Sequence, residues 1–365
     1  MRLGVVAAVV VAGLVIADHV ELNEYVLTPG DAQAVDPLVT VPAGMGHKVH
    51  GAVLLTDVYV TQVTALSYLR WRLDGNAQLV PATTLLGPGT PATEMLTQGY
   101  LDMAQSQDAA KAAALTRLGY SVTERTAGTL IYGVQPGSPA SRVLHVGQVV
   151  TAVGGTPTPD VCAFIGALAP LRPGTVVDLA VHQDRVTSDA RQIPGAVVQR
   201  RVRLTSWPRS VQEPSTTTCP GTIPASHAYL GVQVETQKAF DYPFPVSIRT
   251  STIGGPSAGL AMTLGIIDTL DGGHLTGGQR VAATGTIDPR GDVGDVGGVP
   301  QKTVAVEQAG ATVFFVPSDE KSTAVSKATP SLHVYGVTSL GQVLSILHRL
   351  GGTVPPSHQV SAGAS

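Results

Sequence analysis

Ser257 is the residue of this sequence whose surroundings best suit a nucleophile. It lies in the run Gly254-Gly255-Pro256-Ser257-Ala258-Gly259, between a strand-like segment at 244–250 and an apolar, helix-like segment at 260–270. The glycines permit a tight turn that exposes the hydroxyl. Free N–H groups at the start of the following helix favour negative charge that develops on a substrate. The alternative is that the Ser257 side chain only caps the helix.

A serine hydroxyl needs a neighbouring base, and Lys302 is the candidate. It follows Gly297-Gly298 and opens a predicted helix that ends at Gly310. Apolar neighbours and the positive end of the helix dipole both lower the pKa of a lysine from about 10.4 toward neutrality. An ordinary surface lysine is the simpler alternative. His274, in a loop after two glycines, is the competing base, but it has no obvious orienting carboxylate nearby in the sequence and is interpreted as an exposed loop histidine.

Together these segments resemble the proteolytic domain of Lon-type serine–lysine proteases. The matching residues are Pro256-Ser257-Ala258-Gly259, Thr284-Gly285, Gly291, Gly297-Gly298 and Lys302, eighteen positions after Thr284. The resemblance implies that Ser257 attacks the scissile carbonyl, that Lys302 takes the serine's proton, and that Thr284 hydrogen-bonds the lysine. Backbone N–H groups of Ser257 and Ala258 would then stabilise the oxyanion.

Two positions depart from the Lon pattern. Gly254 stands where classical Lon has Asp, and Thr286 stands where it has Glu. Glycine at the first position is usual in the exported, membrane-anchored PDZ–Lon subfamily of bacteria, which this chain also resembles in Tyr25-Val26-Leu27-Thr28-Pro29-Gly30. The departures leave open an alternative function, that of a catalytically inert Lon-like scaffold that presents a peptide-binding module.

Residues 120–205 have a pattern of their own. Strand-like runs at 129–134, 149–153 and 175–181 are separated by Pro–Gly turns, with a short helix at 160–168. The strings at 133–140 and 144–155 resemble a PDZ domain of the bacterial protease type, although Gln148 replaces the usual Asp. The resemblance implies a domain that binds an extended peptide by β-augmentation.

We therefore predict an α+β multidomain protein with an N-terminal membrane segment, a small β-rich N-terminal region, a PDZ β-barrel domain and a Lon-type proteolytic α/β domain. Within the β-rich region, a helix starts at about Thr93, with an N-cap candidate at Ser106 and a stop at Gly119. The predicted segments are 1–18 (signal anchor or signal peptide), 19–119 (β-rich region with helix), 120–205 (PDZ-like), 206–226 (linker), 227–350 (proteolytic) and 351–365 (disordered tail).

The apolar run Leu3–Ala17 follows a basic start. As a helix it is about 22 Å long, shorter than the ~30 Å hydrocarbon core of a bilayer, and fits a signal peptide. An uncleaved anchor and a buried core helix are alternatives, and the PDZ–Lon resemblance favours the anchor. We expect a single-pass cell-membrane protein whose PDZ and protease domains lie outside the cytoplasm. Cys162 and Cys219 match no zinc pattern; they either pair in an oxidising compartment or remain two separate thiols.

Composition narrows the choice of partners and cofactors. Charged residues make up 13% of the chain, the net charge is −3, and no run of Lys or Arg suggests contact with nucleic acid. We find no metal-ligand pattern, no cofactor motif and no G-x-x-x-x-G-K-[ST] phosphate loop. The expected function is ATP-independent serine endopeptidase activity on exposed or unfolded protein segments. The Lon resemblance adds a possible homo-oligomer.

Overall fold

The computed structural model describes residues 2–85, 92–208, 219 and 228–356. The helices are α1 Arg2–His19, α2 Ala65–Leu73, α3 Ala82–Leu85, α4 Ala92–Arg117, α5 Val161–Leu168, α6 Gly259–Leu270, α7 Val299–Gln308, α8 Lys321–Val325 and α9 Leu340–Arg349. The longer strands are β1 Glu21–Ala34, β3 Ala52–Thr64, β4 Gln78–Pro81, β5 Thr123–Val134, β6 Val149–Val153, β8 Val176–His182, β11 Val197–Arg203, β14 Val232–Asp241, β16 Arg280–Ala283, β19 Val313–Pro317 and β20 His333–Val337.

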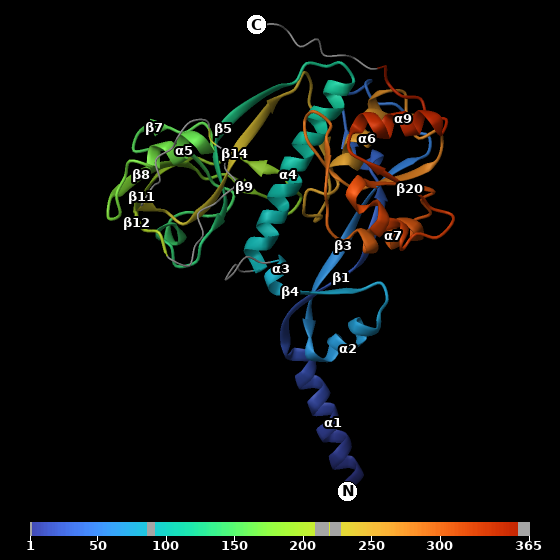
Figure 1. The fold of residues 1–365 in the computed structure, drawn as a ribbon, viewed down its shortest axis with the longest axis horizontal. Helices are drawn as coiled ribbons and strands as arrows, with labels where there is room; N and C mark the ends of the chain where they lie inside the picture. The colour runs from blue at the N-terminus through green and yellow to red at the C-terminus, as the bar shows by residue number, and fades with distance from the viewer. Residues whose placement is uncertain (1, 86–91, 209–218, 220–227, 357–365) are drawn as a thin grey trace.

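Two-residue strands complete the fold: β2 Val39–Thr40, β7 Thr156–Pro157, β9 Arg185–Val186, β10 Gln192–Ile193, β12 Thr205–Ser206, β13 Ala228–Tyr229, β15 Ser247–Ile248, β17 Thr286–Ile287 and β18 Val293–Gly294. Short 3₁₀ turns lie at Asp36–Leu38, Pro139–Arg142 and Ser318–Glu320. The strand predicted over 244–250 is reduced to β15, which pairs with β2. The architecture is mixed α/β, with two lobes on either side of α4 (Figure 1).

The larger lobe is a mixed sheet with the order β20-β19-β16-β3-β1-β4. Strands β3, β16, β19 and β20 run parallel, whereas β1 is antiparallel to both β3 and β4. Successive side chains of a strand point to opposite faces of the sheet, and helices cover both faces. Leu55 and Phe315 pack with α4, α6 and α9, and Leu54 and Phe314 pack with α7 and α8. Strands from the predicted 19–119 region and from the predicted proteolytic domain thus share one sheet.

The smaller lobe is built on the strand order β11-β8-β6-β5-β14, with β7 paired to β6. Its core contains Ile131, Leu179 and Phe164, the last from α5. The predicted helix at 160–168 is confirmed: Asp160 caps α5 by accepting the Ala163 N–H at 2.8 Å. Strand β14 lies beyond residue 227 in the chain yet pairs with β5 over most of its length. The sheet of the PDZ-like segment therefore includes a strand from the predicted proteolytic segment.

Cys162 and Cys219 form a disulfide. It fixes the N-terminal turn of α5 to a residue of the predicted linker. Of the other linker residues, 206–208 are described, whereas 209–218 and 220–226 lie outside the described residues, as do residues 357–365 of the predicted tail. Of the two alternatives for the cysteines, the structure has the paired one.

Helix α4 separates the lobes as one continuous 26-residue element. Its start agrees with the prediction of a helix from about Thr93, and its end agrees with the predicted stop, since Gly119 has a φ of +85°. The predicted N-cap at Ser106 is wrong, because Ser106 lies in the middle of α4 and donates its hydroxyl to the carbonyl of Pro256 at 2.9 Å. Ser106, although of a residue type common at helix N-caps, therefore links α4 to the Ser257 turn.

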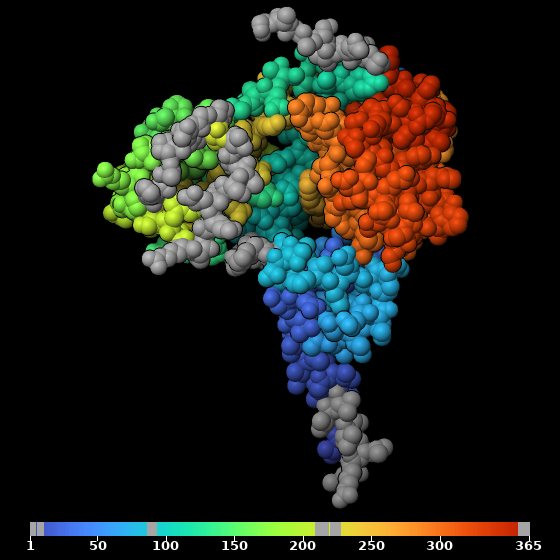
Figure 2. Space-filling model, viewed as in Figure 1, coloured from blue at the N-terminus to red at the C-terminus, as the bar shows by residue number. Residues whose placement is uncertain are grey.

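A narrow neck joins the larger lobe to α1. It consists of the ends of β1 and β3 together with α2, and it projects away from both lobes (Figures 1 and 2). Among the residues that the structure describes, no helix combines the length and apolar character needed to cross a membrane. The membrane segment predicted at 1–18 stays a prediction.

Candidate active site

The turn that carries Ser257 is held by α4. The N–H of Gly255 donates to the carbonyl of Gly99 at 2.7 Å, and the Ser106 hydroxyl binds the next carbonyl, that of Pro256. Gly255 has a φ of +87°, which side chains rarely allow. Helix α6 then begins at Gly259, with Ala258 as N-cap and no side-chain capping bond. The predicted helix at 260–270 is confirmed, and the alternative in which Ser257 caps it is not.

Ser257 is half-buried, and its hydroxyl makes no hydrogen bond to any described residue. Within that part of the chain, the N–H groups of Ser257 and Ala258 are also without acceptors. Free N–H groups at the start of a helix can stabilise an oxyanion. The turn therefore offers both the hydroxyl and the donors that acyl transfer requires.

Lys302 and Thr284 meet behind this turn. The Lys302 amine donates to the Thr284 hydroxyl at 3.2 Å, and that hydroxyl donates to the carbonyl of Ser257 at 3.1 Å. The N–H of Gly285 donates to the same carbonyl at 2.9 Å. The three residues predicted from the sequence therefore form one connected set. The contact that is absent, among the described residues, is a direct bond between the Ser257 hydroxyl and the Lys302 amine.

Lys302 is buried, with 3% of its surface exposed, in the first turn of α7. Burial lowers the pKa of its amine from 10.5 to about 8, and the carboxylates of Glu320 and Asp57 partly oppose this by favouring the charged form. The simpler alternative, an ordinary surface lysine, is thus wrong. An amine with this pKa is neutral in a usable fraction of molecules near neutral pH and can accept a proton.

The sequence analysis missed the two carboxylates near Lys302. Glu320 accepts the Val296 N–H at 3.0 Å through Oε1, while its buried Oε2 has no partner among the described residues. Burial raises the Glu320 pKa, and the lysine charge lowers it. Asp57, on β3, accepts the Asp31 N–H at 2.8 Å, and burial raises its pKa. Neither residue lies in the serine or lysine motif. Their proximity to Lys302 depends on the position of β3 in the sheet and on the turn after β19, so it becomes visible only in the structure.

His274 lies at the other end of α6 from Ser257. Its ring stacks on His50 with 4.4 Å between centroids. Asp268, near the end of α6, has a pKa that burial raises to about 6 and that His274 lowers by a smaller amount. A helix of 12 residues is about 18 Å long, so a base beside this end cannot reach a hydroxyl that precedes the helix. The geometry does not support His274 as the base.

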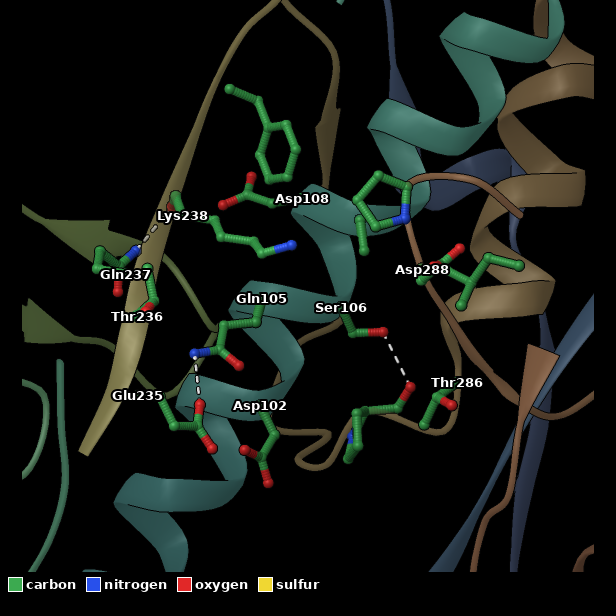
Figure 3. Close-up of a pocket in the computed structure, with 15 residues that line it drawn as sticks. Asp102, Gln105, Ser106, Asp108, Glu235, Thr236, Gln237, Lys238, Thr286 and Asp288 are labelled. Atoms are coloured by element: carbon green, nitrogen blue, oxygen red, sulfur yellow. Dashed lines mark hydrogen bonds between the residues drawn. The ribbon is translucent and has the colours of Figure 1, made fainter. Parts of the chain in front are cut away.

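A cavity of about 290 Å³ opens beside the Ser257 turn. Thr286 and Asp288 line it on one side and the β14 residues Glu235 to Lys238 on the other, with Ser106 of α4 between them (Figure 3). Pro256 is also among its lining residues. Strand β14 is the last strand of its sheet, and its pairing with β5 is irregular between Thr236 and Lys238. The cavity thus connects the edge of the smaller lobe to the turn that carries the candidate nucleophile.

Comparison with known proteins agrees with this geometry. Residues 191–348 match the family model of the Lon protease (S16) C-terminal proteolytic domain, a range that contains Ser257, Thr284 and Lys302. The chain is 32% identical to the Lon protease of Methylocella silvestris over 149 residues, which are 40% of this chain and 18% of that protein. It is 26% identical to Lon protease 1 of Herpetosiphon aurantiacus over 193 residues, which are 51% of this chain and 23% of that protein.

The chain therefore contains a serine-type peptidase domain. More particularly, residues 191–348 are similar to the proteolytic domain of Lon proteases, and the chain spans less than a quarter of the length of these two relatives. Among solved structures, the PDZ domain of an SdrC-like protein from Listeria monocytogenes has a TM-score of 0.21 and 17% identity, covering 29% of this chain and 86% of that one. A PDZ domain from Listeria innocua has a TM-score of 0.21 and 15% identity, covering 30% and 93%.

Proposed function

We propose that this chain is an ATP-independent serine endopeptidase that cleaves exposed or unfolded segments of proteins outside the cytoplasm. Ser257 is the nucleophile, Lys302 the general base, and Thr284 orients the lysine. The observation that carries the proposal is the buried Lys302 amine, bonded to a threonine whose hydroxyl is in turn bonded to the backbone of Ser257. A neutral, desolvated amine beside a serine is what the activation of a hydroxyl requires.

In the proposed mechanism, the Ser257 hydroxyl turns toward the Lys302 amine when a substrate binds. The serine oxygen forms a bond to the peptide carbonyl carbon as the amine takes its proton. The N–H groups of Ser257 and Ala258 bind the oxyanion, and the protonated lysine gives its proton to the leaving amine as the C–N bond breaks. Water then attacks the acyl-enzyme by the same route in reverse and releases Ser257.

The smaller lobe is proposed to hold substrate tails as a PDZ module. Strand β14 pairs with β5 on one side and, among the described residues, with no strand on the other. An extended peptide added to that open edge would satisfy its backbone groups. Because the same edge lines the cavity at Pro256, a peptide bound there would lead toward Ser257.

The proposed site of action outside the cytoplasm, with the chain anchored to the cell membrane through residues 1–18, is supported by two features. Leu3–Ala17 form an apolar run after a basic start. The Cys162–Cys219 disulfide is of the kind that persists in oxidising compartments.

ATP independence is proposed because the sequence has no phosphate-binding loop. Assembly into a homo-oligomer is also proposed, on the Lon resemblance alone.

Casein cleavage by purified variants tests the proposal. Ser257→Ala and Lys302→Ala are each expected to lower the rate by at least about 10³-fold, whereas the exposed Lys321→Ala is expected to leave it unchanged. His274→Ala should also retain the wild-type rate. Full turnover by Lys302→Ala would refute the assignment of the base, and a clear increase with ATP and Mg²⁺ would refute ATP independence. Peptide binding without cleavage in any condition would instead support the inert scaffold.

A further inference from the structure

Helix α2 presents a row of exposed leucines. Leu66, Leu69 and Leu73 are 42%, 65% and 78% exposed. Spacings of three and four residues place them on one face of the helix. We call these three residues the α2 face. None of the nine residues of α2 is buried, so this helix contributes nothing to the core of the protein.

The α2 face is built into the fold and is not a frayed end. Thr64 and Ser67 form a reciprocal capping box: the Ser67 N–H binds the Thr64 hydroxyl at 3.2 Å, and the Thr64 N–H binds the Ser67 hydroxyl at 2.9 Å. Isolated helices of this length are marginal in water, and most helices are stabilised by packing an apolar face. A capped helix that turns three leucines outward therefore indicates a surface that is covered in use.

The neighbours of the α2 face identify what covers it. Arg70 and Arg72 are exposed, and neither forms an ion pair within the described part of the chain. Tyr68 and Trp71 are half-buried, and the Arg70 guanidinium lies 4.6 Å from the centre of the Trp71 ring. On the helix surface Arg70 and Arg72 lie on the two sides of the α2 face, and leucines bordered by arginines are typical of helices in the boundary between lipid headgroups and acyl chains. The arginines carry charge of the sign that anionic headgroups attract.

The α2 face also continues an apolar surface on α1. The two helices are in contact. On α1, Val11, Leu14, Val15 and Ile16 are 48–64% exposed. Both helices lie at the end of the neck, away from the lobes that carry Ser257 (Figure 1). A flat lipid surface can meet both helices there without touching the candidate active site.

We propose that α2 lies on an anionic lipid surface, with the α2 face between the headgroups and the acyl chains and with Arg70 and Arg72 beside the phosphates. Tyr68 and Trp71 lie at the same depth as the headgroups. The contact orients the neck and so fixes the height of the lobes above the lipid. It does not depend on the proposed peptidase chemistry.

Fluorescence of Trp71 tests the proposal in the full chain. Trp207→Phe leaves Trp71 as the sole tryptophan, since the sequence contains two. The protein is reconstituted into vesicles with about one-third phosphatidylglycerol in phosphatidylcholine, with and without bromine on the acyl chains. Brominated lipid is expected to lower the Trp71 emission, although by less than it would for a tryptophan on the α2 face itself, because Trp71 lies two positions from both Leu69 and Leu73 and therefore on the other side of the helix. If Trp207→Phe does not fold, the difference between the wild-type and Trp71→Phe proteins gives the same quantity.

Two variants separate this contact from any contact made by α1. The double variant Leu69→Asp with Leu73→Asp should abolish the bromine quenching of Trp71 even where the chain stays on the vesicle. Leu96→Asp, which alters a 53% exposed leucine on α4, should not. In vesicles of phosphatidylcholine alone the quenching should weaken, and Arg70→Gln with Arg72→Gln should weaken it on anionic vesicles.

Two results would overturn the proposal. One is Trp71 emission that acrylamide quenches freely and brominated lipid does not change. The other is protection of Trp71 that persists in detergent and rises with protein concentration, which would assign the α2 face to a second copy of the chain.

Discussion

The charge state of Lys302 should control the pH dependence of cleavage. Burial lowers its pKa to about 8, and only the neutral amine can accept the Ser257 proton. A base with this pKa is neutral in about one-tenth of molecules at pH 7 and in about nine-tenths at pH 9. We therefore expect kcat/KM for an unstructured peptide to rise about tenfold between these two pH values and to level off above them.

Glu320→Gln is the perturbation that tests the cause of this pKa. The Glu320 carboxylate raises the Lys302 pKa, so its removal should lower that pKa further and move the inflection below pH 8. A decrease of one unit, from about 8, would raise the neutral fraction at pH 7 from about one-tenth to about one-half, a gain of about fivefold. Glutamine keeps an oxygen that can accept the Val296 N–H, so the segment that leads into α7 should keep its position.

The assay is kcat/KM measured from pH 6 to pH 10 for the wild type, Glu320→Gln and Asp319→Asn. Asp319 is exposed on the same turn and is not among the groups that shift Lys302, so its variant should keep the wild-type inflection. A wild-type inflection near 6.5 would point to a histidine base. An inflection that stays in place, or moves upward, in Glu320→Gln would refute the coupling between the two groups.

Three further changes should alter stability in measurable ways. Lys302→Met should raise the free energy of unfolding by about 3 kcal/mol below pH 8 and lose that gain between pH 8 and pH 10.5, since burial opposes the proton of Lys302 for as long as the amine of the unfolded chain would be protonated; urea titrations at pH 7 and pH 10 measure this. Cys162→Ser with Cys219→Ser should lower the stability of the smaller lobe by up to about 4 kcal/mol, because the disulfide closes a separation of 57 residues; chemical denaturation shows it. Gly259→Ala should cost about 1–3 kcal/mol and slow cleavage, because its Cβ would lie 2.9 Å from Ile287; a thermal stability equal to the wild type would contradict the tight packing.

Local chemistry made the serine and lysine predictable from the sequence. The turn before α6 and the start of α7 are each specified by neighbouring glycines and prolines, and the Thr284–Lys302 bond joins residues only 18 positions apart. The Ser106 prediction failed for the opposite reason. A serine before an apolar run satisfies the capping rule, but its partner is the Pro256 carbonyl, 150 positions away. Only the packing of α4 against the Ser257 turn decides between the two.

The sequence also did not predict that strands from different predicted segments share one sheet. The short apolar run at 52–56, before Asp57, indicates a strand but does not identify its neighbour. In the structure, β3 pairs in parallel with β16, more than 200 residues later, and so brings Asp57 toward Lys302. Glu320 arrives from the turn after β19. Long-range pairing thus determines the electrostatic environment of a lysine whose own position local sequence predicts.

The arrangement of the sheet explains why Thr284 is the residue that connects the site. Helix α6 packs on one face of the sheet and α7 on the other, and both begin close to the end of β16. Thr284 is the first residue after that strand, so one hydroxyl reaches the Ser257 carbonyl on one side and the Lys302 amine on the other. Two helix N-termini then act on the same small region. One stabilises an oxyanion at Ser257, and the other disfavours a charged Lys302, so the fold itself promotes both requirements of the proposed chemistry.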